Sequence, residues 1–328
     1  MENQILWLNR KEVEKLLDMK GTLKVVEEAF RQHGLKKVQM PPKLYLYFKN
    51  HNGDLRTMPA YLEEQDITGV KIVNVHPDNP KSGLPTVMAL VILNSTQTGA
   101  PLAIMDGTYL TDMRTGAAGG VAVKHLARRN SKTVGFVGTG NQARTQLLAI
   151  NEIIDIHEIK ATSTSEKQIL AFKDDMELLT ECEITAKKTI KEVCDCDILV
   201  TTTPSREPIV MDEWISEGTH INAIGADAPG KEELDPRILK RARVVVDDIA
   251  QASHSGEINV PLSKGLLSVK DIFCELGEVI TGKKKARTSN SDITVFDSTG
   301  LAIQDVATAN MVYMKALKEN MGITLKQF

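Results

Sequence analysis

Six residues near the middle of the chain have the types and spacing of a nucleotide-binding loop. The string Gly138-Thr139-Gly140-Asn141-Gln142-Ala143 follows the apolar run TVGFV and opens a helical pattern. In a strand–turn–helix setting the first glycine permits a tight turn and the second lets the backbone approach a pyrophosphate, while the alanine allows close helix–strand packing. The helix N-terminus would offer free N–H groups to phosphates. The motif predicts a dinucleotide site; the alternative is a glycine-rich turn without a ligand.

The end of the next predicted strand bears on which dinucleotide is bound. NAD-selective sites place Asp or Glu there, about 20 residues further along the chain. Here the strand HEIKAT runs into Ser163-Thr164-Ser165, and Glu158 lies too early, at the start of the strand. Three hydroxyl groups, with Arg144 or Lys167 as a cation, could bind a 2′-phosphate that no carboxylate repels. The sequence therefore favours NADP(H) over NAD(H); the alternative is that Ser163 contacts the ribose hydroxyls of NAD.

Two ionisable residues lie where proton transfer is plausible. Lys71 is in the middle of GVKIVNV with apolar neighbours on both sides, and lysine is almost never buried alone. Burial would lower the pKa of its amine, as a proton shuttle requires, unless this face of the strand is solvated. Asp227 follows HINAIG, at the carboxyl end of a predicted parallel strand, where open α/β sheets bind ligands. The alternative for Asp227 is an ordinary turn or helix cap.

The elements that must hold these groups follow two patterns. Residues 9–35 read as helices, with Asn9 and Glu12 as a capping box and Gly21 as an interruption. Short strands then follow, LYLYF, LRTMPAYL, GVKIVNV and TVMALVIL, which predict a mainly antiparallel sheet. From about residue 116 strands and helices alternate, including a helix around Met211–Ser216, as in an α/β doubly wound parallel sheet. The last helix, Ala302–Glu319, belongs to neither pattern.

Length and composition limit the classes of protein. The 328 residues suggest about two domains, and the formal charge of -3 with 4% aromatic residues disfavours a nucleic-acid binder. Neither a membrane span nor a signal peptide is expected from the sequence. Four cysteines suggest a reduced, cytoplasmic protein, and Cys194 and Cys196 fit buried thiols better than half of a metal site. No metal site is predicted.

Several long strings together carry a family resemblance. They are KIVNVHP from Lys71, GLPTV from Gly83, MRTGA from Met113, HINAIGADAPGKEELD and FDSTGLAIQD. On these motifs the chain resembles the ornithine cyclodeaminase/mu-crystallin family over essentially its whole length. The resemblance implies that a Rossmann dinucleotide-binding domain, residues 119–302, is inserted into a discontinuous α+β domain of residues 1–118 and 303–328. It also implies that the latter domain binds substrate and forms a homodimer.

The resemblance further implies roles for individual residues. Lys71 and Asp227 match the proton-transfer positions, and Lys43 and Arg56 match the carboxylate clamp, with Thr299 replacing another substrate-contacting residue. Outside the glycine loop and Ser163–Ser165, the positions that match cofactor contacts are Thr86, Arg114 (at the pyrophosphate), Thr203, Ile224, Gly225, Ala226, Lys231 and Ser298.

The chemistry implied is hydride transfer from the α-carbon of an L-amino acid, with L-alanine as the favoured substrate, and hydrolysis of the imine to a 2-oxo acid and ammonia. Reduction of a cyclic imine such as pyrroline-2-carboxylate and ornithine cyclodeamination stay open, because they use the same residues. A different class is an NADP(H)-binding protein of the mu-crystallin type. The presence of Lys43, Arg56, Lys71 and Asp227 favours an enzyme.

Overall fold

The computed structural model describes residues 4–326, which form two compact units. The first comprises the chain up to Arg114 together with the chain from Leu301 onward, and the second is Thr115–Gly300. The chain therefore leaves the first unit within helix α3 (Thr108–Leu126) and returns to it just before helix α11 (Ala302–Glu319). The sequence-based boundaries are at residues 118 and 302. Residues 1–3, which belong to the predicted first domain, lie outside the described residues, as do 327 and 328.

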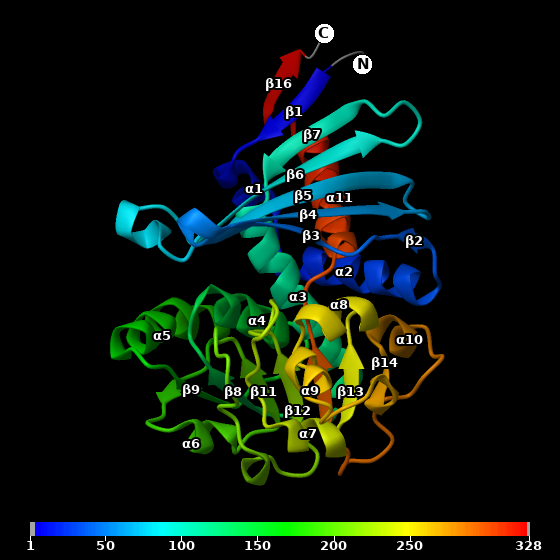
Figure 1. Cartoon of the computed structure of the whole chain (residues 1–328). Helices are drawn as coiled ribbons and strands as arrows, with labels where there is room; N and C mark the ends of the chain where they lie inside the picture. The colour runs from blue at the N-terminus through cyan, green and yellow to red at the C-terminus, as the bar shows by residue number, and fades with distance from the viewer. Residues whose placement is uncertain (1–3, 327–328) are drawn as a thin grey trace. The chain divides into compact units, whose positions relative to one another are not determined.

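The first unit is built on one eight-stranded sheet (Figure 1). The strand order is β16-β1-β7-β6-β5-β4-β2, with β3 also paired to β4, and all pairs are antiparallel except β1 with β7. The prediction of a mainly antiparallel sheet is confirmed. The strands are β1 (Gln4–Leu8), β2 (Val38–Gln39), β3 (Leu44–Phe48), β4 (Gly53–Leu62), β5 (Ile67–Val75), β6 (Val87–Ser95), β7 (Pro101–Asp106) and β16 (Ile323–Lys326).

Helices α1 (Arg10–Leu16), α2 (Met19–Gly34) and α11 belong to this unit, and α11 contacts β4, β5 and β6. The predicted capping box is confirmed: Asn9 accepts the N–H of Glu12, whose carboxylate accepts the N–H of Asn9. The predicted interruption at Gly21 is wrong. The break lies at Leu17 and Asp18, because the Asp18 carboxylate caps α2 by accepting the N–H of Gly21 at 2.6 Å.

Side chains of β5 alternate between the two faces of the sheet. Lys71 and Val73 are buried on the face that α11 covers, whereas Val70 and Ile72 on the other face are only partly buried. The mid-strand lysine thus points into the unit's interior, not toward solvent.

Short 3-10 turns of the same unit lie at Lys49–His51 and Asn79–Ser82.

The second unit is a doubly wound sheet of eight parallel strands, as predicted, in the order β10-β9-β8-β11-β12-β15-β13-β14. Both faces are covered, because clusters around Phe136, Leu147 and Phe172 and around Leu199, Ile221 and Leu239 pack against the sheet. The predicted helix around Met211–Ser216 is only a 3-10 turn, Asp212–Trp214; another turn is Val269–Asp271.

The strands of the second unit are β8 (Thr133–Val137), β9 (Glu158–Thr162), β10 (Ile184–Ala186), β11 (Ile198–Thr201), β12 (His220–Ala223), β13 (Arg243–Val246), β14 (Ile272–Glu275) and β15 (Thr294–Asp297). Its helices, besides the end of α3, are α4 (Asn141–Asn151), α5 (Glu166–Thr180), α6 (Ile190–Cys194), α7 (Pro236–Arg241), α8 (Ile249–Ser255), α9 (Asn259–Ser263) and α10 (Leu276–Ile280).

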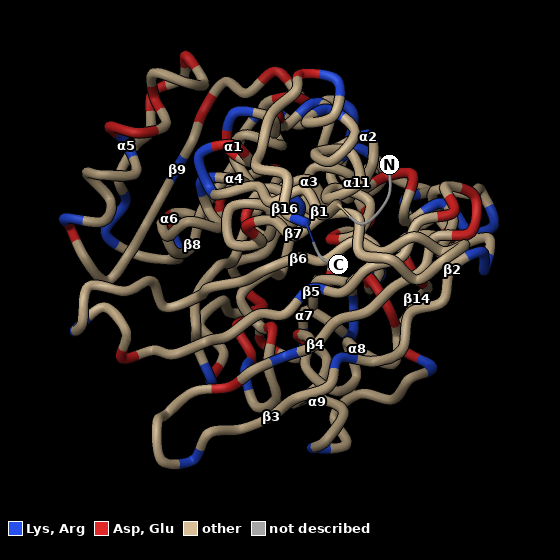
Figure 2. The backbone as a smooth tube through the Cα atoms, turned by 90° about the horizontal axis from the view of Figure 1, so that it is seen from above, with Lys and Arg blue, Asp and Glu red and all other residues tan. Residues whose placement is uncertain are grey.

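Charged residues of both signs are mixed along residues 4–326. Figure 2 shows Lys and Arg interspersed with Asp and Glu along the backbone. No helix of this span is long and apolar enough to cross a bilayer. Cys194 and Cys196 are free thiols, and burial raises the pKa of Cys194 to about 12. Within the same span no group of three His, Cys, Asp or Glu could hold a metal ion.

Candidate active site

The predicted glycine loop joins β8 to α4 in the second unit. Gly138 has φ +94°, a left-handed conformation, and a Cβ there would lie 2.9 Å from Oγ1 of Thr202. Gly140 is the N-cap of α4 with φ -79°, and a Cβ there would meet nothing within 4 Å. The first glycine is therefore required by the turn itself, whereas the second leaves open space in front of the helix N-terminus, where the exposed Asn141 and half-buried Gln142 follow.

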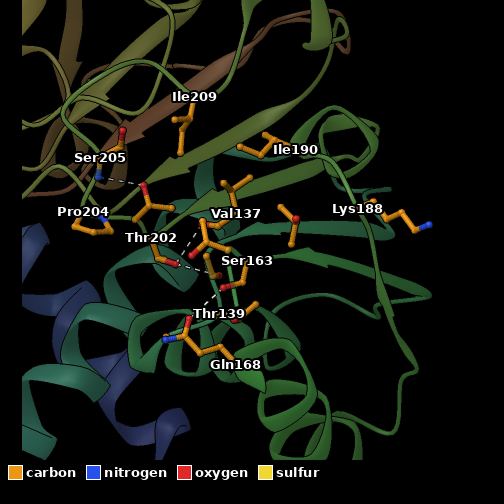
Figure 3. Close-up of a pocket in the computed structure, with 15 residues that line it drawn as sticks. Val137, Thr139, Ser163, Gln168, Lys188, Ile190, Thr202, Pro204, Ser205 and Ile209 are labelled. Carbon is orange, nitrogen blue, oxygen red and sulfur yellow. Dashed lines mark hydrogen bonds between the residues drawn. The ribbon is translucent and has the colours of Figure 1, made fainter. Parts of the chain in front are cut away.

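A cavity of about 690 Å³ opens at the carboxyl ends of β8, β9 and β11 (Figure 3). Thr139 lies in its wall, and its Oγ1 is buried without a hydrogen-bond partner in the described part of the chain. A glycine that permits the tight turn, space at Gly140 and an unused hydroxyl are features that suit a bound pyrophosphate, so the residues fit a dinucleotide. The lining residues are Val137–Gly140, Thr162–Thr164, Gln168, Lys188, Ile190, Thr202–Ser205 and Ile209.

Ser163 and Thr164 lie in this cavity at the end of β9, without a neighbouring carboxylate on that strand end. Ser163 donates to Oε1 of Gln168 at 3.1 Å, a contact drawn in Figure 3. Ser165 is instead the N-cap of α5 and accepts the N–H of Gln168.

The predicted cations at the ribose end need correction. Arg144 is engaged elsewhere, because its Nε and Nη2 bind Asp175 at 2.8 and 2.6 Å and its Nη1 donates to the Thr139 carbonyl. Lys167 is exposed and does not line the cavity. The lysine that does line it is Lys188, which the sequence analysis missed because it follows the short strand β10 and carries no motif.

Loops after β11 and β12 are held together by a buried glutamate. Glu233 accepts the N–H of Thr203 at 2.6 Å with one oxygen and the N–H of Gly225 at 3.0 Å with the other. Burial raises the pKa of this carboxyl group. Thr203 lines the cavity, and the flanking Ile224 and Ala226 are buried. Glu233 is not among the predicted site residues, and its only signal in the sequence is the acidic pair beside Leu234 in GKEELD.

The remaining predicted residues of the second unit lie at the carboxyl ends of β12 and β15. Asp227 and Lys231 form an ion pair of 2.5 Å. Ser298 is buried, and its hydroxyl has no hydrogen-bond partner within residues 4–326, which leaves it available to a ligand. Thr299 differs from Ser298, because its hydroxyl already donates a hydrogen bond to Oδ1 of Asp247 at 3.1 Å.

In the first unit a buried ion cluster surrounds Lys71. Its Nζ donates to Oδ1 of Asp305 at 2.8 Å, and Nε of Arg114 donates to the same oxygen at 2.8 Å. Nη1 of Arg114 donates to Oε1 of Gln304 at 2.9 Å. Lys71 is 1% exposed and Asp305 is completely buried. Asp305 is not among the predicted site residues, although a carboxylate among Ala302, Ile303, Val306 and Ala307 on an apolar helix was a usable signal.

The environment of Lys71 suits proton transfer. Burial lowers the pKa of its amine to about 7; the positive charges of Arg114 and Lys43 act in the same direction, and Asp305 opposes them. A buried lysine whose pKa lies near neutrality can both accept and release a proton under ordinary conditions.

The other predicted residues of the first unit surround this strand. Arg56 is buried, binds Asp54 through Nε at 2.9 Å and Nη2 at 3.1 Å, and lies over the Tyr45 ring. Lys43, just before β3, is half-buried. Thr86 lies just before β6, where its carbonyl accepts the N–H of His76. Arg56 and Lys71 therefore supply inward-facing cationic groups on adjacent strands β4 and β5.

Comparison with known proteins gives consistent matches. The model of the ornithine cyclodeaminase/mu-crystallin family matches residues 3–320. Alanine dehydrogenase of Archaeoglobus fulgidus is 55% identical, over 99% of both chains. An archaeal alanine dehydrogenase dimer with bound NAD is similar in structure, with a TM-score of 0.96, 54% identity and 99% and 100% of the two chains covered. The structure of Delta(1)-pyrroline-2-carboxylate reductase of Thermococcus litoralis, in complex with NADH and L-proline, is also similar, with a TM-score of 0.94 and 41% identity. The match covers 97% of this chain and 99% of the reductase chain.

Proposed function

The chain belongs to the ornithine cyclodeaminase/mu-crystallin family, and from that premise we propose that it is an NAD(P)-dependent L-amino acid dehydrogenase that interconverts L-alanine with pyruvate and ammonia. The observation that carries the proposal is the buried amine of Lys71 among inward-facing cations on one unit, with a dinucleotide-fitting cavity on the other. Bound NAD(P)+ supplies the hydride acceptor.

The residues of the chain supply the other requirements of the reaction. Arg56, with Lys43, is assigned to the α-carboxylate, because a guanidinium has five N–H donors and can bind a substrate carboxylate in addition to Asp54. Neutral Lys71 takes a proton from the substrate ammonium, and its lowered pKa makes that form available near pH 7. Asp227 is assigned to activate the water that attacks the imine carbon, and its carboxylate forms an ion pair with Lys231.

A direct assay tests this proposal. L-alanine with NAD+ or NADP+ is followed by formation of the reduced cofactor, and pyruvate with ammonia by its loss. Pyrroline-2-carboxylate with reduced cofactor, and ornithine with NAD+, are run in parallel. Alanine oxidation with production of pyruvate is the expected result. The absence of alanine turnover alongside reduction of pyrroline-2-carboxylate would assign the second activity, which the Thermococcus litoralis relative at 41% identity favours as the alternative.

For the cofactor, we propose that the enzyme accepts NADP(H) at least as well as NAD(H). Support comes from the end of β9, where Ser163 and Thr164 line the cavity with Lys188 and no carboxylate stands at the strand end. A hydroxyl tolerates either a ribose hydroxyl or a 2′-phosphate, whereas a carboxylate repels the phosphate. The relatives described above contain NAD or NADH, which a serine at this position can also bind.

Ser163→Asp is expected to shift the ratio of kcat/KM for NAD+ to that for NADP+ by about tenfold or more toward NAD+, because the new charge repels the 2′-phosphate. The ratio is measured by initial rates with each cofactor. Ser165→Asp is the matched control: it adds the same charge at the N-cap of α5, outside the cavity lining, and should change the ratio much less. Equal ratios for Ser163→Asp and the unmodified protein would contradict this interpretation.

We propose that the enzyme is a homodimer formed through the face of the first unit's sheet opposite α11. Thr57, Ile72 and Leu90 are neighbours across β4, β5 and β6, and this face carries exposed apolar side chains, with Leu90 42% exposed and Met88 37% exposed. An apolar sheet face of this kind is typical of a subunit interface. The related archaeal alanine dehydrogenase is a dimer.

Leu90→Asp is expected to convert the dimer to monomers at micromolar concentration, because two buried charges would face each other's apolar neighbours. Light scattering after size-exclusion chromatography measures the mass. The control is Leu178→Asp on α5, which places the same charge at an 86% exposed leucine and should leave the dimer intact. A dimer that persists in Leu90→Asp would place the interface elsewhere.

A further inference from the structure

One oxygen of Asp305 serves both buried cations of the first unit. Lys71 and Arg114 each donate to Oδ1 at 2.8 Å, and side chains of all three residues are at most 7% exposed. The other oxygen, Oδ2, is buried and has no hydrogen-bond partner among the residues that the structure describes. The carboxylate therefore directs its hydrogen bonding to these two cations.

Burying the Asp305 carboxylate costs desolvation free energy, which suggests that this residue has a role other than stabilising the fold. It lies on the face of α11 that contacts β4 and β5, among Ala302, Val306 and Ala309. Burial of an ionised carboxylate is compensated only in part by its ion pairs, and such clusters can often be replaced by apolar residues without loss of stability. A role in orienting and charging the amine of Lys71 explains its presence.

We propose that Asp305 is the positioning residue of the reaction: it orients the Lys71 amine and supplies the negative charge that lets this amine exchange protons. The inference rests on the proposed function and deepens it. The charged and titratable groups that face Lys71 are Asp305 on α11, Arg114 and Asp112 on α3, and Lys43 before β3.

The charges of these groups determine the direction in which the pKa of Lys71 changes when Asp305 is lost. Burial and the charges of Arg114 and Lys43 lower the pKa of Lys71, and Asp305 is the group that raises it. Loss of Asp305 therefore moves the pKa below its value of about 7, so that the amine rarely holds a proton at neutral pH. Burial raises the pKa of Asp112 to about 6, whereas the charges of Arg114 and Lys71 lower it, so the titrations of Asp112 and Lys71 are linked.

The first test is the pH dependence of kcat/KM for alanine oxidation. The rate constant should rise tenfold per pH unit up to about pH 7 and then level, since neutral Lys71 is the base. Asp305→Asn should shift this limb to lower pH by about one unit or more and should lower kcat, because the amine also loses its orientation. The reverse reaction and pyrroline-2-carboxylate reduction should show the opposite limb, since they need the protonated amine.

Asp305→Glu separates charge from geometry. It keeps the negative charge, so the limb should stay near its original pH, while the displaced carboxylate should still lower kcat. Cofactor binding, followed by protein fluorescence, should be unchanged in both variants. A limb at the same pH in Asp305→Asn as in the unmodified enzyme would overturn the proposal, as would unchanged kcat in Asp305→Glu.

A stability measurement tests the same inference without turnover. The native pKa of Lys71 is lower in Asp305→Asn than in the unmodified protein, so the unmodified protein binds more protons just below pH 7. The gap, defined as the melting temperature of the unmodified protein minus that of Asp305→Asn, should therefore become smaller as pH rises through 7. A constant gap would overturn the inference. If no substrate is turned over but the gap narrows, the proposed function fails and the coupling of Asp305 to Lys71 stands.

Discussion

Lys71→Met is expected to lower kcat for alanine oxidation about 1,000-fold and to leave the Kd for NAD(P)H within about twofold. The thioether fills the volume of the lysine stem but cannot accept a proton, so the loss falls on the chemical step. The proposed dinucleotide site belongs to the other unit, where the glycine loop and its cavity lie. Steady-state rates and titration of cofactor fluorescence measure the two quantities.

The fold should survive this change. Asp305 keeps its ion pair with Arg114, and burial already disfavours the charged form of the Lys71 amine. The control is Lys160→Met on β9, which removes another buried lysine, one that donates to the Asp195 carbonyl. Lys160→Met should retain most activity. Near-normal rates in Lys71→Met would show that another group transfers the proton.

Gly140→Val is expected to weaken binding of NAD(P)H at least about 100-fold, because three carbon atoms would occupy the space that the pyrophosphate needs. The free protein offers no obstacle to this side chain: φ is -79° and a Cβ meets nothing within 4 Å. Stability should fall by no more than about 1 kcal/mol, the approximate cost of an apolar residue at an N-cap. Isothermal titration and thermal melting measure binding and stability.

Two neighbouring variants make this test specific. Gly140→Ala should weaken binding by an intermediate factor, because it adds one carbon atom at the same place. Gly138→Ala should lower stability itself, since φ is +94° and its Cβ would approach Thr202. Tight dinucleotide binding by a folded Gly140→Val protein would contradict the placement of the pyrophosphate at this loop.

The glycine loop was predictable because its determinants are local. A tight turn, an N-cap and helix–strand packing involve residues only a few positions apart, and the string from Gly138 to Ala143 records all three. The same holds for the capping box at Asn9. Gly21 failed because a glycine can lie within the first turn of a helix when a preceding side chain, here Asp18, binds its N–H.

The surroundings of the predicted cations were less accessible to sequence reasoning. Arg144 is a suitable charge near the loop by sequence, but Asp175, 31 residues away, binds its guanidinium. Lys188 reaches the cavity because β10 pairs with β9. Neither fact has a local signal, since both depend on which segments the sheet brings together.

The sequence by itself determined the parallel doubly wound sheet, the mainly antiparallel sheet, the dinucleotide loop and the identity of Lys71 as an unusual residue. Periodicity, turn residues and local motifs carry that information, because each reflects contacts between residues close in sequence. Only the tertiary structure decided what charges Lys71 meets. Asp305 is 234 residues further along the chain and reaches Lys71 because α11 returns to the first unit's sheet. The pKa of a buried amine depends on such long-range neighbours, so the chemistry of Lys71 is a property of the fold.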